Sequence, residues 1–215
     1  MTVAVVNPGC VPWVGMADTH IDHLDVADRL RHDQARAVAE TRWRACAPDR
    51  FRDAHLGHCD IHGPDVTRPV RDWVVGGSTG SLTLLGAVGT GKTYLALAVA
   101  RAFITDGRRA VMFLPMVEAL SSMRPDGGLS PVELSSIDLL VLDDVGTERV
   151  TEWAAEQMYA VLNRRWLSEL PTVITSNLPL DELATHLGPR AWSRLTGDDS
   201  VVVRLTGPDR RRTRP

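Results

Sequence analysis

From residue 81 onward, hydrophobic and polar positions alternate between two kinds of pattern. Short, continuously apolar runs typical of buried strands recur, and between them apolar residues return at helical spacing. The apolar runs predict strands at 81–85, 110–114, 137–142, 172–175 and 200–205. The intervening stretches predict helices at 92–106, 115–123, 151–170 with Thr151 as N-cap, 181–187 and 189–195. This alternation predicts an α/β fold with a parallel sheet that helices cover on both faces.

The first third of the chain is less regular. Residues 1–20 show no periodicity, 18–47 have helical spacing up to Pro48, and 48–72 are rich in Pro, Gly, His and Asp. The last of these predicts irregular connection. We therefore divide the chain into an N-terminal tail and helix, 1–47, and one folded domain, 48–215. The helix either docks a partner or covers the domain's own core.

Composition narrows the class of protein. The chain has 215 residues and a net charge of −3, which argues against a uniformly basic coat for nucleic acid. The sequence contains no long apolar run, so we expect no membrane partner, and the opening residues lack the basic start of a secretory signal. Three cysteines fit a reducing cytoplasm better than a disulfide framework. Lys92 is the only lysine beside 23 arginines.

That lysine lies in the strongest motif of the chain, a complete GxxxxGK[ST] between a predicted strand and a predicted helix. Its residues are Gly86, Ala87, Val88, Gly89, Thr90, Gly91, Lys92 and Thr93. Such a loop points several backbone N–H groups at one anion, and the helix N-terminus adds partial positive charge. In this type of site the lysine reaches the β- and γ-phosphates, and the hydroxyl that follows it ligates Mg²⁺. We expect ATP and Mg²⁺ here.

Two acids follow the predicted strand at 137–142. Carboxylates at the C-terminal end of a parallel strand lie where open α/β sheets bind ligands. We expect Asp143 to hold Mg²⁺ and Asp144 to orient and deprotonate the attacking water. Asn177 follows the next strand, which should place it near the γ-phosphate or that water. Arg190 and Arg194 share one helical face, and one of them is a candidate to complete a neighbouring subunit's site.

Taken together, GAVGTGKT, LLVLDDVG, ITSNLP and SRL resemble, in this order and spacing, the AAA+ ATPases of the IstB/DnaC-like family. That family comprises helicase loaders and transposition helper ATPases. The resemblance covers about residues 48–211 and implies a P-loop three-layer α/β/α sandwich with the strand order 5-1-4-3-2 and little or no helical lid. Asp144 stands where the family more commonly has Glu. The resemblance assigns the trans-acting arginine to Arg194 and a sensor 2 role to Arg211.

The function that the resemblance implies is ATP hydrolysis that loads or remodels a replicative DNA helicase. It also implies single-stranded DNA as a further partner and head-to-tail homo-oligomers in the ATP-bound form. Two alternatives stay open: a transposition helper ATPase, and an adaptor that binds ATP with little turnover. Two weaker patterns also stay open, a zinc site among Cys46, His55, His58, Cys59 and His62 and a DNA contact of the basic run 210–214.

Overall fold

Five short strands form one parallel sheet in the computed structural model, which describes residues 34, 37, 38, 40, 41, 43, 44, 47–77, 79–105, 110–149 and 151–210. The strands are β1 (Ser81–Gly86), β2 (Val111–Pro115), β3 (Leu139–Asp143), β4 (Thr172–Ser176) and β5 (Val201–Leu205). Their order in the sheet is β2-β3-β4-β1-β5, and every neighbouring pair is parallel. This is the predicted order, counted from the other edge, and it confirms the expected α/β class.

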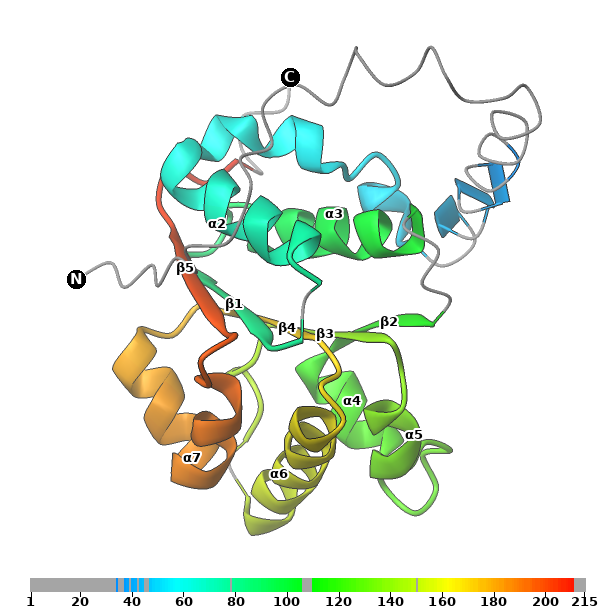
Figure 1. Ribbon diagram of the computed structural model, residues 1–215. Helices are drawn as coiled ribbons and strands as arrows, with labels where there is room; N and C mark the ends of the chain where they lie inside the picture. The colour runs from blue at the N-terminus through cyan, green and yellow to red at the C-terminus, as the bar shows by residue number, and fades with distance from the viewer. Residues whose placement is uncertain are drawn as a thin grey trace.

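Helices cover both faces of the sheet, as Figure 1 shows. They bury two separate apolar layers against it. One face carries α2 (Pro64–Val75) and α3 (Lys92–Thr105). The other carries α4 (Met116–Ser122), α5 (Pro131–Ser135), α6 (Glu152–Leu167) and α7 (Leu180–Leu195). The central strands β1, β3 and β4 are buried along almost their whole length, which explains why their sequences are continuously apolar.

The two helical pieces predicted around Gly188 lie within α7, which bends at this residue. Gly188 has φ 76° and ψ 160°, a conformation outside the helical region that glycine adopts readily. The predicted N-cap of α6 is confirmed, because the Thr151 hydroxyl accepts a hydrogen bond from the Ala154 N–H at 3.1 Å. Both helices therefore begin or bend where the local sequence dictates.

The prediction of irregular connection over 48–72 is wrong. This stretch holds two short 3₁₀ helices, η2 (Asp49–Phe51) and η3 (Leu56–His62), and most of α2. Helix α2 forms because Val66, Val70 and Trp73 lie on one buried face, and this amphipathic spacing outweighs the internal Pro69. Helix α5 lies between the predicted elements at 115–123 and 137–142 and was not predicted; Ser130 and Glu133 make a capping box at its start.

The described end of the predicted 18–47 helix packs into the core. Residues 37, 38, 40, 41, 43 and 44 are helical, and Trp43 is only 2% exposed. The Trp43 indole donates to the Arg52 carbonyl at 2.7 Å, and Glu40 pairs with Arg101 of α3 at 2.7 Å. This part of the helix therefore covers the domain's own core. Residues 1–33 lie outside the described part of the chain, so a docking role for them stays a proposal.

Arg165 fastens α6 to the start of the sheet. Its side chain is 1% exposed and donates to the Ile137 carbonyl at 2.7 Å, to the Thr172 hydroxyl at 2.9 Å and to the Pro171 carbonyl. Burial lowers the pKa of the guanidinium to about 10, so it stays charged at neutral pH.

None of the helices in the described part of the chain is long and apolar enough to span a bilayer.

Candidate nucleotide-binding site

The polar residues expected from the sequence meet at one edge of the sheet because the strands that carry them are parallel and in register. Leu85 of β1 pairs with Ser176 of β4, and Leu142 of β3 pairs with Ile174 of β4. The loop after β1, the acids at the end of β3 and Asn177 after β4 therefore leave the sheet side by side. Open α/β sheets bind ligands at this edge.

Lys92 lies at the centre of this edge. Its ammonium group donates to the carbonyls of Gly86 and Ala87 at 2.9 and 3.0 Å and to Asn177 Oδ1 at 2.7 Å. The residue is only 4% exposed, so polar groups of the protein, these oxygens among them, stabilise its charge in place of water. The structure thus brings together two of the predicted residues, Lys92 at the start of α3 and Asn177 after β4.

The loop before Lys92 has the backbone conformation that an anion cradle needs. Gly89 and Gly91 have φ values of 81° and 99°, which other residues adopt only with strain. Helix α3 begins at Lys92, so its first N–H groups and its dipole face the same space. The arrangement of Gly86–Thr93 fits the phosphates of a nucleotide.

Thr93 and Asp143 offer a set of oxygen ligands. The Thr93 hydroxyl lies 3.1 Å from both Asp143 oxygens. On the other side of Asp143, the Thr175 hydroxyl donates to Oδ1 at 2.6 Å and accepts from the Asp144 N–H at 2.9 Å. Mg²⁺ prefers such oxygen donors and needs only one or two carboxylates when phosphates and water supply the other positions. The residues present therefore fit Mg²⁺.

The electrostatics of Asp143 agree with a cation partner. Burial raises the pKa of this carboxyl above its ordinary value, and the nearby Asp144 charge adds to the rise. Hydrogen bonds from Thr175 and Thr93 and the charge of Lys92 oppose it. A divalent cation beside this carboxylate would stabilise its charged form.

Asp144 lies beside Asp143 in a strained conformation. Its φ is 55°, in the left-handed region that asparagine and aspartate tolerate best among residues other than glycine. The Asn177 amide approaches Asp144 Oδ1 at 3.4 Å. Unlike Asp143, which is buried, Asp144 is partly exposed.

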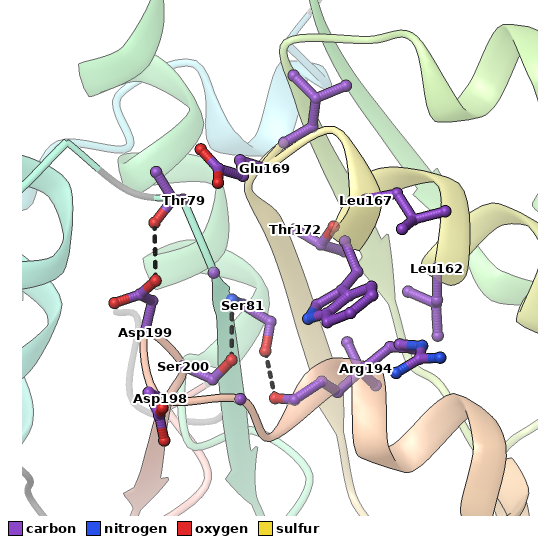
Figure 2. A pocket seen from close by; sticks show the side chains of 15 residues that line it. Thr79, Ser81, Leu162, Leu167, Glu169, Thr172, Arg194, Asp198, Asp199 and Ser200 are labelled. Atoms are coloured by element: carbon purple, nitrogen blue, oxygen red, sulfur yellow. Dashed lines mark hydrogen bonds between the residues drawn. The ribbon is translucent and has the colours of Figure 1, made fainter.

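Arg194 lies at the opposite edge of the sheet. It lines a cavity of about 300 Å³ together with residues at the N-terminal ends of β1, β4 and β5, among them Ser81, Thr172 and Ser200 (Figure 2). The Arg194 guanidinium stacks on the Trp166 ring at 4.1 Å from its centroid, and Nε donates to Asn163 Oδ1 at 2.9 Å. Arg194 and the Gly86–Thr93 loop of the same chain therefore face away from each other.

The structure describes some, but not all, of the remaining site residues predicted from the sequence. Arg190 is exposed on α7, and Arg211 and Cys46 lie outside the described residues. The Cys59 thiol is buried and donates to the His55 carbonyl, and burial raises its pKa to about 11, so it is protonated at neutral pH. Among the residues that the structure describes, no group of three His, Cys, Asp or Glu side chains could hold a metal ion.

Three contacts at the site were not found by sequence reasoning. Thr175 connects the two acids, and its only signal was a polar residue inside an apolar strand. Glu148 accepts from the Gly146 N–H at 2.9 Å and pairs with His186 at 2.7 Å, which ties the loop after β3 to α7. The third contact brings Asp209, after β5, against Gly89. The last two join distant parts of the chain, so local spacing carries no sign of them.

Comparison with known proteins identifies related sequences. The family model described as "IstB-like ATP binding protein" matches residues 73–199, more than half of the chain. The phage-like element PBSX protein XkdC of Bacillus subtilis (strain 168) is 35% identical over 135 residues, covering 58% of this chain and 50% of that protein. The replicative helicase loader DnaC of Escherichia coli (strain K12) is 28% identical over 134 residues, covering 59% and 54%.

The chain spans about half the length of each of these two relatives. Among solved structures, a crystal structure of the DnaC helicase loader superposes with a TM-score of 0.63 at 24% identity, covering 74% of this chain and all of that one. This likeness confirms the α/β fold with its five-stranded parallel sheet. It leaves the roles of individual residues to the geometry described above.

The raised pKa of Asp143 predicts how Asp143→Asn changes stability. Because the folded state favours the protonated acid, protonation of Asp143 adds to the free energy of unfolding. This contribution is complete below the ordinary carboxyl pKa and is lost as the pH rises through the raised pKa. We expect Asp143→Asn, without nucleotide or metal, to unfold at a higher temperature than the wild type at pH 8. Thermal unfolding at successive pH values should show this difference shrinking toward pH 4.

The matched control is Asp126→Asn, at an exposed loop position, which should shift the unfolding temperature little and by the same amount at every pH. If Asp143→Asn is less stable than the wild type at pH 8, the hydrogen bonds to Asp143 outweigh its burial, and the electrostatic description of the site is wrong.

Proposed function

The chain belongs to the family of IstB-like ATP binding proteins, and on this premise we propose that it hydrolyses Mg·ATP to load or remodel a replicative DNA helicase. The observation that supports this most is the convergence of Lys92, Asn177, Asp143 and Thr93 at one sheet edge. The helicase part of the proposal is supported by the similarity to a replicative helicase loader over 134 residues.

In this proposal the backbone amides of 86–93 hold the phosphates, and Lys92 exchanges its present oxygen partners for β- and γ-phosphate oxygens. Thr93 and Asp143 hold Mg²⁺, and when bound the ion neutralises charge on the phosphate oxygens. Only a modest movement of the Lys92 ammonium is needed, because it already lies between the loop carbonyls and the Asn177 side chain.

Hydrolysis requires a water aligned with the γ-phosphorus. Asp144 accepts a proton from this water while the water oxygen forms a bond to the γ-phosphorus. At the same time the bond from the γ-phosphorus to the β–γ bridging oxygen breaks. Asn177, which approaches both Lys92 and Asp144, orients the water or the γ-phosphate. Asp144 has a shorter side chain than the glutamate that is more common at this position in the family. The measured turnover rate therefore distinguishes an ATPase from an adaptor that binds ATP with little turnover.

The two roles predict different defects. We expect Lys92→Ala to weaken ATP binding about 10- to 100-fold, the scale of losing a charge-assisted hydrogen bond. Asp144→Asn should keep ATP affinity but lower kcat about 10²- to 10⁴-fold, the usual contribution of a general base. Equilibrium binding and phosphate release, each with and without single-stranded DNA, measure both effects. Wild-type affinity and turnover in Lys92→Ala would rule out the assigned site, and wild-type turnover near zero under all conditions would favour the adaptor.

Arg194 is the residue that we propose acts on the nucleotide of a neighbouring subunit. Its position at the N-terminal edge of the sheet separates it from its own loop, so a head-to-tail assembly would bring it to the next subunit's phosphates. Trp166 and Asn163 hold the guanidinium through its face and through Nε. Its two terminal nitrogens remain the natural donors to a phosphate.

A mixing experiment tests this role. Arg194→Ala and Lys92→Ala should each turn over ATP at least about a hundredfold more slowly than the wild type, given the usual effect of such arginines. An equimolar mixture should recover activity beyond the sum of its parts, because intact loops of one variant then face intact arginines of the other. Arg190→Ala, four residues earlier on α7, is the control and should turn over normally. Loss of turnover in Arg190→Ala instead, or no recovery on mixing, would contradict the assignment.

Two kinds of partner fit the family, a replicative helicase or a transposase. Similarity to the DnaC loader favours the helicase, whereas the IstB-like description of the family model keeps a transposition helper as the alternative. Single-stranded DNA is proposed as a further ligand. Of the basic run 210–214, Arg210 is described, and its guanidinium already contacts the Ile61 carbonyl at 3.3 Å.

A retention assay distinguishes the partners. Because hydrolysis is proposed to release the partner, Asp144→Asn with ATP should trap the complex. We expect this variant to retain the hexameric replicative helicase of the organism that encodes the chain, and Lys92→Ala to retain much less of it. Retention of an integrase-fold transposase, with no retention of the helicase, would replace the loader assignment with the transposition helper.

A further inference from the structure

The segment after β5 returns to the nucleotide loop. Leu205, the last residue of β5, pairs with Gly86, the first residue of the loop, so the two chain segments leave the sheet side by side. Residues 206–210, which we call the C-terminal strap, then cross the loop. The Arg210 N–H donates to the Gly89 carbonyl at 3.0 Å, so the strap is bonded directly to the loop.

The side chain of Asp209, in the strap, packs against the loop. A Cβ atom built on Gly89 would overlap Oδ1, Cγ and Cβ of Asp209, which means that the Asp209 side chain fills the space a larger residue would need. Gly89, with φ 81°, is thus required both for its backbone conformation and for this close approach. Asp209 is partly buried, so water screens its charge less than that of an exposed acid.

A second set of contacts fixes the strap from the other side. The Arg210 guanidinium donates to the Ile61 carbonyl at 3.3 Å, and Ile61 belongs to η3. His62, the last residue of η3, lies against Gly91 of the same loop. The strap, the loop and η3 therefore contact one another in turn, and the position of Asp209 is set by residues on both sides of it.

We propose that Asp209 is an affinity- and specificity-determining residue of the nucleotide site. This inference rests on the assignment of 86–93 as the phosphate loop. A carboxylate in contact with Gly89 repels the phosphates that the loop receives, and it repels the more highly charged ATP more strongly than ADP. The protein therefore binds ATP more weakly than it would with a neutral side chain of the same shape at position 209.

Asp209→Asn tests the charge, because it keeps the size and shape of the side chain. We expect the Kd of ATP with Mg²⁺, measured by calorimetry, to fall about three- to tenfold, and the Kd of ADP to fall less. The tightening should decrease as the salt concentration rises, since salt screens a charge effect. Asp209→Ala should change the two Kd values in the same direction, which separates repulsion from any contact that Asn makes.

Asp126→Asn is the matched control. It removes one negative charge at an exposed loop position between α4 and α5. It should leave both Kd values within about twofold of the wild type. The proposal is overturned if Asp209→Asn and Asp209→Ala leave the Kd of ATP unchanged or raise it, or if Asp126→Asn lowers it equally.

Failure of this proposal is distinguishable from failure of the nucleotide site itself. If Lys92→Ala abolishes ATP binding while the Asp209 variants behave as the wild type, the site is correct and only the role of Asp209 is wrong. If Lys92→Ala binds ATP normally, the site is wrong, and Asp209 has no phosphates to repel. Thermal unfolding of each variant shows whether the strap change affects the fold.

Discussion

A single buried ammonium group connects the parts of this molecule on which its function depends. Lys92 begins α3, bonds to two carbonyls of the loop that follows β1, and reaches Asn177 beyond β4. A charge this deeply buried is tolerated only when polar groups surround it. Three of those groups are the neutral oxygens of Gly86, Ala87 and Asn177, and a phosphate would be a stronger partner than any of them. The contacts that hold the ammonium therefore place it where an anion can bind.

The sheet makes these contacts possible by setting its strands in register. Thr175 shows this on the scale of one residue, since its hydroxyl bonds both the Asp143 side chain and the Asp144 backbone. Asp143 is thereby held near Thr93, while Asp144 takes a left-handed conformation and is partly exposed. Two neighbouring acids of identical chemistry are given different environments, as their proposed roles of metal ligand and general base require.

The sequence predicted the sheet and most of the site because both depend on short-range patterns. Continuous apolar runs are the mark of buried parallel strands, and the Gly86–Thr93 motif fixes a loop geometry by itself. The failures have physical reasons. Helix α2 was missed because the Pro, Gly, His and Asp content of 48–72 indicated irregular structure, although Val66, Val70 and Trp73 share a buried face. The contacts of Asp209 with Gly89 and of Glu148 with His186 depend on the three-dimensional arrangement of β5 and α7, which no local spacing encodes.

The most direct test is a crystal structure of the protein grown with Mg²⁺ and a non-hydrolysable ATP analogue. The account predicts the analogue's phosphates within the 86–93 loop, the Lys92 ammonium moved from Asn177 Oδ1 to the phosphates, and the metal between Thr93 and Asp143. An analogue bound elsewhere, with Lys92 still bonded to Gly86, Ala87 and Asn177, would contradict it.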